Sequence, residues 1–193
     1  KTLKNFSNSS DVHIGPISIG MHFNPYGESL VENKKKIRLE MADSDPRHDQ
    51  LFSLTWTLAI FIQSINKESK FFTFNSIYGH HGILNKDNTK RPLYYLNDFL
   101  ISLSNSEIYK FNPINEVYGL KIVLNDKEYY LFVNSSNQKK EINISELNFS
   151  YQYKLNLKNF TDIFKNDFSF FNFKKDTNPY AFEPLEIKFI EDK

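Results

Sequence analysis

The sequence of 193 residues contains no cysteine, which excludes disulfide bonds and any catalytic or metal-binding thiolate. It has no apolar run near the roughly 18 residues of a membrane-spanning helix, and its polar N-terminus lacks the apolar core of a signal peptide. Charge of neither sign is in excess, because 24 Lys and Arg stand against 23 Asp and Glu. We therefore predict a cytoplasmic protein that binds neither nucleic acid nor membranes.

What the chain does have is apolar and aromatic content, at 40% and 16% of its residues, which is enough to build a proper core. All five histidines lie between residues 13 and 81. An apolar run at 14–19 is followed there by a dense set of polar side chains. These are His22, Asn24, Tyr26, Glu28, Asp43, Asp45, Arg47, His48 and Asp49. We expect the chemistry of the protein in this first half.

Strands and helices alternate in the first half of the sequence. Two apolar runs, 13–20 and 70–77, are typical of buried strands, although Pro16 cannot donate to a strand ladder and predicts a distorted or terminal first strand. Helices are expected at 46–66 and 92–104. This order predicts two βα units with a parallel pair of strands.

The first of these helices has a clear start signal, because Asp45 is a good N-cap and Pro46 suits the first helical position. Two apolar stripes run along it at spacings of three and four residues. The stripes contain Leu51, Leu54, Leu58, Phe61 and Ile65, and Phe52, Trp56, Ala59 and Ile62. A helix that is apolar on two sides is expected to be buried between other elements.

The second half shows alternation with a period of two instead, which is typical of short strands. The segments are 107–111, 115–124, 128–134, 139–144, 151–157 and 184–190, with a hairpin connection at Asn125-Asp126. Several short strands at regular spacing predict an antiparallel β-sandwich. We place a domain boundary near residue 105.

Four motifs in the first half resemble the C-terminal part of the D-apionate lactonase family. They are IGPISIGMHFNPYG, DPRHDQLFSLTWTL, FFTFNSIYGHHGIL and RPLYYL. The resemblance implies a build like that of clan-A glycoside hydrolases, in which a (β/α)8 barrel is followed by a β-sandwich, and an activity that opens D-apionolactone to D-apionate. Residues 1–104 would then be the last βα units of the barrel, and 105–193 the sandwich.

The resemblance also implies a truncated chain, because a complete barrel takes roughly 250 residues. Two βα units alone leave an uncovered apolar face, so we expect self-association and an incomplete active site.

In such barrels the chemistry lies in loops that follow the C-terminal ends of the strands. The first strand then directs His22, Asn24 and Tyr26 to the site. The second directs Asn75, Tyr78, His80 and His81 to the same place. Lactone hydrolysis needs a base for water and a donor or cation for the developing oxyanion. We assign the catalytic role to His22 and His80, and binding of a small sugar lactone to Asn24, Tyr26, Asp45, Arg47 and His81.

Structural interpretations of the same residues stay open. Asn24 suits a simple turn, Asp45 a helix cap, and His80-His81 a surface turn, while Arg47 can pair with Asp43. His48 and Asp49 are expected in a solvated first turn of the helix. Adjacent histidines usually point apart and no metal-ligand spacing occurs, so we predict neither a metal nor another cofactor.

Two other functions compete with a lactonase. A glycoside hydrolase needs two carboxylates about 5 to 9.5 Å apart, and the turn at 78–82 contains no carboxylate. A non-catalytic, carbohydrate-binding β-sandwich would leave the polar cluster of residues 22–49 without a purpose.

Overall fold

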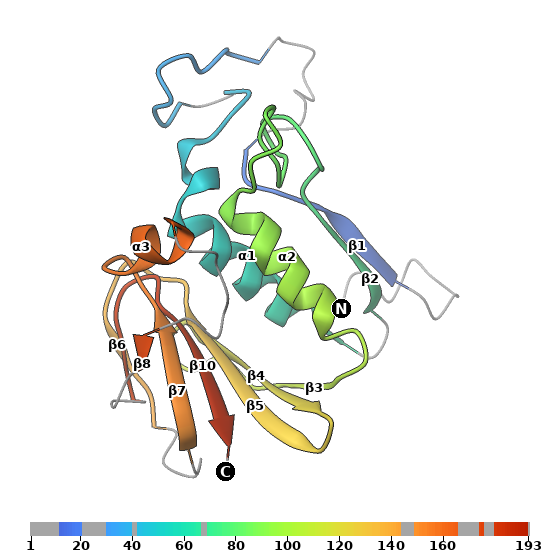
Figure 1. The fold of residues 1–193 in the computed structure, drawn as a ribbon, viewed down its shortest axis with the longest axis vertical. Coiled ribbons are helices and arrows are strands. Elements are labelled where there is room, and N and C mark those ends of the chain that lie inside the picture. Colours follow the sequence, from blue (N-terminus) through green and yellow to red (C-terminus); the bar gives the residue numbers. More distant parts are fainter. Residues whose placement is uncertain are drawn as a thin grey trace.

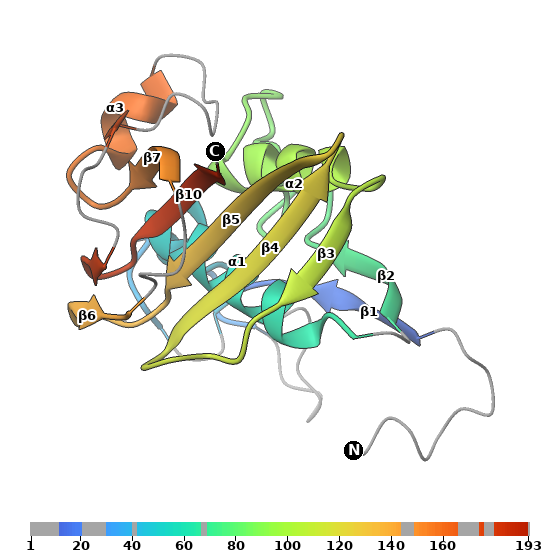
Figure 2. The same cartoon turned by 90° about the horizontal axis from the view of Figure 1, so that it is seen from below.

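The computed structural model describes residues 12–20, 30–39, 42–66, 69–143, 149–165, 174–175 and 180–192. The described elements form three layers (Figure 1). Strands β1 (Val12–Ile17) and β2 (Ser69–Phe74) make the first layer, and helices α1 (Leu51–Ser64) and α2 (Pro92–Ser102) make the second. A six-stranded sheet is the third layer, on the other side of the helices (Figure 2).

The first layer confirms the predicted parallel pair, because β1 and β2 run in the same direction. The ladder register shifts between Ile14 and Ile17, on either side of Pro16, as expected for a strand that contains proline. The strands also approach closely at Gly15, where an added Cβ would lie 2.6 Å from the carbonyl oxygen of Thr73.

The prediction of one helix over 46–66 is wrong at its start. Residues Pro46–Asp49 form a short 3-10 helix, η2, and α1 begins only at Leu51. Between them Gln50 is extended, with φ −118° and ψ 166°. Asp45 is indeed an N-cap, but of η2, since its side chain accepts a hydrogen bond from the Arg47 N–H. The second helix agrees with its prediction to within two residues.

Helix α1 is buried between both sheets, as its two apolar stripes predict. On one side the ring of Phe61 packs edge-on against Phe72 and Phe74 of β2, with ring centroids 5.1 and 6.0 Å apart. On the other side it contacts β4 (Val117–Leu124) and β5 (Lys127–Asn134) of the six-stranded sheet. The main core joins α1, α2 and this sheet. Its fully buried members include Leu54, Leu58, Ile62, Leu93, Leu96, Leu120, Leu131, Leu155 and Ile187.

The third layer is antiparallel throughout, in the order β3-β4-β5-β10-β7-β8. Its strands are β3 (Glu107–Lys110), β4 (Val117–Leu124), β5 (Lys127–Asn134), β7 (Phe149–Leu155), β8 (Lys174–Lys175) and β10 (Ile187–Asp192). The β4–β5 turn forms where predicted, and Asn125 and Asp126 both have positive φ, as a tight hairpin turn requires.

A separate two-stranded sheet consists of β6 (Lys140–Glu141) and β9 (Ala181–Phe182), and a short helix α3 (Phe160–Lys165) follows β7. Phe182 of β9 and Ile142, which follows β6, join a second apolar cluster with residues of the large sheet, namely Val117, Tyr130, Phe132 and Ile190. The described residues thus form one large antiparallel sheet with a small partner, and within them the full predicted sandwich is not established.

No helix among the described residues is long and apolar enough to cross a membrane.

Candidate functional site

The carboxyl ends of β1 and β2 meet at one edge of their sheet, because the strands are parallel. The Asn75 N–H, just after β2, donates to the carbonyl of Ile17 at 2.9 Å. Farther along, Nδ1 of His81 lies 3.2 Å from the carbonyl oxygen of Ile19, to which it donates when protonated. The chain after β1 and the turn after β2 are therefore in direct contact, as the barrel rule predicts. His22, Asn24 and Tyr26 lie outside the described residues.

His80 faces a carboxylate from a different segment. Its Nε2 lies 3.5 Å from Oδ2 of Asp43, with the His80 side chain 56% exposed and that of Asp43 23%. Although desolvation raises the pKa of Asp43, hydrogen bonds from the Asn33 N–H and from Ser44, together with the charge of His80, outweigh it and leave this pKa below its usual value. Asp43 is consequently ionised at neutral pH and can stabilise a protonated His80.

The position of Asp43 depends on Asn33, a residue that the sequence analysis missed. Asn33 is 6% exposed. Its amide nitrogen donates to the carbonyls of Ile37 and Ser44 at 2.7 and 2.9 Å, and its amide oxygen accepts from the Ile37 N–H. Its own N–H donates to Oδ1 of Asp43 at 3.1 Å. One buried side chain thus holds the loop that brings Asp43 to His80, and nothing local in the sequence marks it.

Asp45 and Arg47 form a two-pronged ion pair. Nη2 and Nε of Arg47 lie 2.6 and 2.9 Å from Oδ2 and Oδ1 of Asp45. The hydrogen bond from Arg47 is the main reason that the pKa of Asp45 is lowered. The Arg47 guanidinium also lies over the ring of Phe52, 4.8 Å from its centroid. The expected pairing of Arg47 with Asp43 is therefore wrong, because the near carboxylate two residues away satisfies the guanidinium first.

His48 is not in a solvated turn, contrary to the prediction, since it is only 2% exposed. Its Nε2 lies 2.9 Å from the carbonyl oxygen of Gly82, which can only accept, so Nε2 carries the proton. Desolvation lowers the pKa of His48 and favours its neutral form. Its neighbour Asp49 is exposed and pairs with Arg91 at 3.3 Å. Burial thus gives the two adjacent residues opposite environments.

Asn75 has a buried amide without a partner. The residue is 8% exposed, and neither amide atom makes a hydrogen bond within the part of the chain that the structure describes. Its φ of 60° lies in the left-handed region, which Asn tolerates better than most residues. An unpaired buried amide costs about 1–3 kcal/mol, so a ligand or neighbouring group that bonds it is favoured.

The described residues contain no group of three or more His, Asp or Glu side chains arranged to hold a metal ion. The pair that the structure does bring together is the imidazole of His80 and the ionised carboxylate of Asp43. An imidazole beside an ionised carboxylate is an arrangement that can move a proton.

Comparisons with known proteins match the first half of the chain to a TIM-barrel domain family. Residues 1–105 match the family model described as "D-apionate lactonase, TIM barrel domain". Among curated proteins, the D-apionate lactonase of Brucella anthropi is 28% identical over 139 residues, which cover 69% of this chain and 22% of that protein. The chain thus spans less than a quarter of the length of this relative.

Solved structures show a weaker likeness. A GH30 endoxylanase from Clostridium papyrosolvens C71 is 10% identical with a TM-score of 0.48, over 75% of this chain and 39% of that one. A conserved exported protein from Bacteroides fragilis is 8% identical with a TM-score of 0.49, over 83% and 37%.

Proposed function

The chain belongs to the D-apionate lactonase family, and from this premise we propose that it takes part in hydrolysis of a sugar lactone, with D-apionolactone as substrate and D-apionate as product. The observation that carries the proposal is the pairing of His80 with the ionised Asp43, 3.5 Å apart, at the edge where the barrel strands end. The relative in Brucella anthropi bears the name of this activity.

The proposed reaction begins with a water molecule hydrogen-bonded to the imidazole of His80. His80 takes a proton from the water as its oxygen attacks the lactone carbonyl carbon, and Asp43 stabilises the imidazolium that forms. The tetrahedral intermediate then collapses, the ring C–O bond breaks, and His80 returns the proton to the leaving alkoxide. The products are one hydroxyl and one carboxylic acid, which ionises at neutral pH.

The developing oxyanion needs a hydrogen-bond donor, and the unpaired amide of Asn75 is the candidate among the described residues. We assign contacts with the sugar hydroxyls to Asn24, Tyr26 and His81, and keep His22 as a second candidate base. Asp45 and Arg47 would act there as a pair, since each already bonds the other.

We also propose that residues 1–104 are the last βα units of a TIM-type barrel and that 105–193 form an antiparallel β-sandwich. The parallel β1–β2 pair, the end of the family match at residue 105 and the purely antiparallel pairing of the large sheet support this division. In a crystal structure of the whole protein, β1 and β2 are expected as neighbours in one closed barrel. A sheet that ended at β1 would contradict the proposal.

A glycosidase mechanism fits the site less well. It needs one carboxylic acid that stays protonated near neutral pH, and therefore a raised pKa. Asp43, which faces His80, and Asp45 both have lowered pKa values, and Asp45 is bonded to Arg47 through both oxygens. Both are thus anions that cannot donate a proton to a leaving sugar.

The test follows acid release in a pH-stat by the purified whole protein, because the 193 residues alone are expected to have an incomplete active site. D-apionolactone is expected to release one equivalent of acid with enzymatic turnover, and xylan is expected to yield no reducing sugar. Reducing sugar from xylan without acid release from the lactone would overturn the proposal in favour of a glycosidase.

A further inference from the structure

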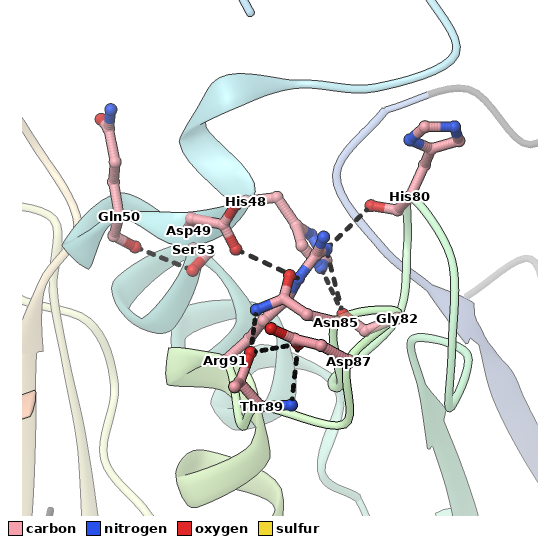
Figure 3. Close-up of polar contacts among 10 residues, drawn as sticks. All are labelled: His48, Asp49, Gln50, Ser53, His80, Gly82, Asn85, Asp87, Thr89 and Arg91. Atoms are coloured by element: carbon pink, nitrogen blue, oxygen red, sulfur yellow. Dashed lines mark hydrogen bonds and ion pairs between the residues drawn. The ribbon is translucent and has the colours of Figure 1, made fainter.

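The turn that carries His80 is held in place by hydrogen bonds from an arginine. Arg91 is the residue before α2, and its side chain points back toward the turn (Figure 3). Its Nη1 donates to the carbonyl of His80 at 3.2 Å and to that of Gly82 at 3.3 Å. Its backbone N–H also donates to the carbonyl of Ile83 at 2.9 Å. One residue thus donates hydrogen bonds to three carbonyls of the turn and its exit, those of His80, Gly82 and Ile83.

Arg91 is itself held in place. Its Nε donates to Oδ1 of Asn85 at 2.7 Å and lies 3.3 Å from Oδ1 of Asp49, and the side chain is only 14% exposed. The amide of Asn85 in turn donates to the hydroxyl of Thr89 at 2.8 Å. Because Asp49 precedes α1 and Asn85 lies in the loop before α2, the guanidinium connects both helix starts to the turn.

His48 of η2 also holds the turn, because its Nε2–H donates to the same Gly82 carbonyl. Gly82 therefore accepts hydrogen bonds from two separate side chains on one carbonyl oxygen. Figure 3 shows His48 and Arg91 converging on this atom from different elements. These contacts are all to main-chain atoms, so they fix where the turn runs and leave the imidazole of His80 free to react.

His80 needs such support, because its own side chain is more than half exposed and meets Asp43 only at 3.5 Å. An exposed side chain on a short turn takes its position from the backbone that carries it. We propose that Arg91 is a positioning residue, which sets the His80 imidazole against Asp43 by holding the carbonyls of His80 and Gly82. The inference rests on the proposed role of His80 as the base.

Lysine cannot replace this guanidinium. The contacts need donors in a planar fork that point to two carbonyls on one side and to Asn85 and Asp49 on the other. An ammonium group keeps the charge but loses the fork, so the turn is expected to shift while the fold stays intact. A misplacement of about 1 Å in a catalytic group can lower turnover by about 100-fold.

The experiment compares Arg91→Lys with Arg38→Lys, a matched change at an exposed arginine that makes no hydrogen bond to the turn at 78–82 among the described residues. For Arg91→Lys we expect kcat on D-apionolactone to fall about 10- to 100-fold with KM within about twofold. Added guanidinium is expected to restore part of the activity of Arg91→Ala. Arg38→Lys is expected to match the wild type in both constants.

A second readout does not depend on turnover. The imidazole Cε1–H signal of His80 in NMR spectra, assigned with His80→Gln, is expected to move in Arg91→Lys, while that of His13 on β1 stays in place. If Arg91→Lys does not fold, Asn85→Ala carries the same test, because it removes the acceptor of Nε and keeps the guanidinium.

The outcomes separate the two proposals. An unchanged kcat together with an unchanged His80 signal in Arg91→Lys overturns the positioning role. Wild-type turnover in His80→Ala overturns the proposed function instead, and a displaced His80 signal in Arg91→Lys then still supports the positioning role.

Discussion

Gly82 offers a direct test of how tightly the turn at 78–82 is built. An added Cβ there would lie 2.5 Å from the carbonyl carbon of Tyr78, 2.7 Å from its Cα and 2.9 Å from the nitrogen of Gly79. All three are backbone atoms, so no side chain can swing away. Since carbon atoms normally pack at about 3.5 Å or more, Gly82→Ala requires a backbone shift of about 1 Å.

Overpacking of this kind costs about 1–3 kcal/mol, and we expect the upper end because the neighbours are backbone atoms. For a chain of this size that corresponds to a Tm lower by about 6–12 °C. The shift also displaces the Gly82 carbonyl from His48 and Arg91, so kcat on the lactone is expected to fall by about 100-fold.

Gly79→Ala is the matched control in the same turn. Among the described residues nothing lies within 4 Å of a Cβ at Gly79, whose φ is +92°, so only backbone strain of about 1–2 kcal/mol is added. Thermal unfolding followed by circular dichroism and pH-stat kinetics measure both variants. A Gly82→Ala variant with a Tm within about 1 °C of the wild type, which is below the smallest effect expected here, and with an unchanged kcat would show that the turn at 78–82 is not tightly packed.

Three further predictions concern other buried polar groups. Asn75→Gly removes an unpaired amide at a positive φ, so the free energy of unfolding in urea is expected to stay within about 1 kcal/mol of the wild type, or to rise, while kcat falls at least about tenfold. A lower free energy of unfolding with a normal kcat would contradict the assignment of Asn75 as oxyanion donor. Lys188→Ala removes the cation that lies 3.5 Å from buried Glu186 and is expected to lower the free energy of unfolding by about 3–5 kcal/mol. The double variant Lys188→Met, Glu186→Gln is expected to restore most of this loss, and equal losses in the single and the double variant would argue against an electrostatic cause. Burial lowers the pKa of His48, so its contribution to stability is complete above the pKa of 6.5 in the unfolded chain and is lost as the pH falls below that value. His48→Gln keeps a donor for the Gly82 carbonyl and is expected to make the free energy of unfolding depend less on pH between about pH 8 and 5. An unchanged pH dependence would assign that dependence to other groups.

Periodic segments of this chain could be predicted from the sequence because a single local pattern determines each. The two stripes of α1 predict a helix with apolar contacts on both sides, and the structure places it between two sheets. Alternation along β4 and β5, with Asn125-Asp126 between them, predicts a hairpin, and the two strands do pair in this way. In these elements the side chains that decide the structure are also neighbours in sequence.

Contacts between distant segments could not be predicted in the same way. His48 follows a helix-start signal and was expected in solvent, but its partner Gly82 lies 34 residues away. No local signal indicates that Gln50 interrupts the helix. Lys188 alternates with apolar residues along its strand, a pattern that predicts an exposed side chain. The side chain is nevertheless fully buried and donates to the carbonyl of Ala181 in β9. Each of these depends on which segment covers a side chain, and periodicity does not carry that information.

The candidate site shows the same division. The barrel rule predicts that the His80-His81 turn lies near the end of β1, and the ring of His81 is in contact with the Ile19 carbonyl there. Asp43, which pairs with His80, comes from a loop ordered by Asn33, and Arg91 reaches the turn from the start of α2. These supporting residues act through main-chain and loop geometry, which no spacing in the sequence reveals.

The central claim is that His80, paired with Asp43, is the base that opens the lactone. Its most direct test is kcat/KM on D-apionolactone for His80→Ala, beside His13→Ala as a control in which an exposed histidine on β1 is removed. We expect a loss of about 100- to 10,000-fold for His80→Ala and wild-type kinetics for His13→Ala. Turnover of His80→Ala within about twofold of the wild type, far outside the range expected for loss of a general base, would contradict it.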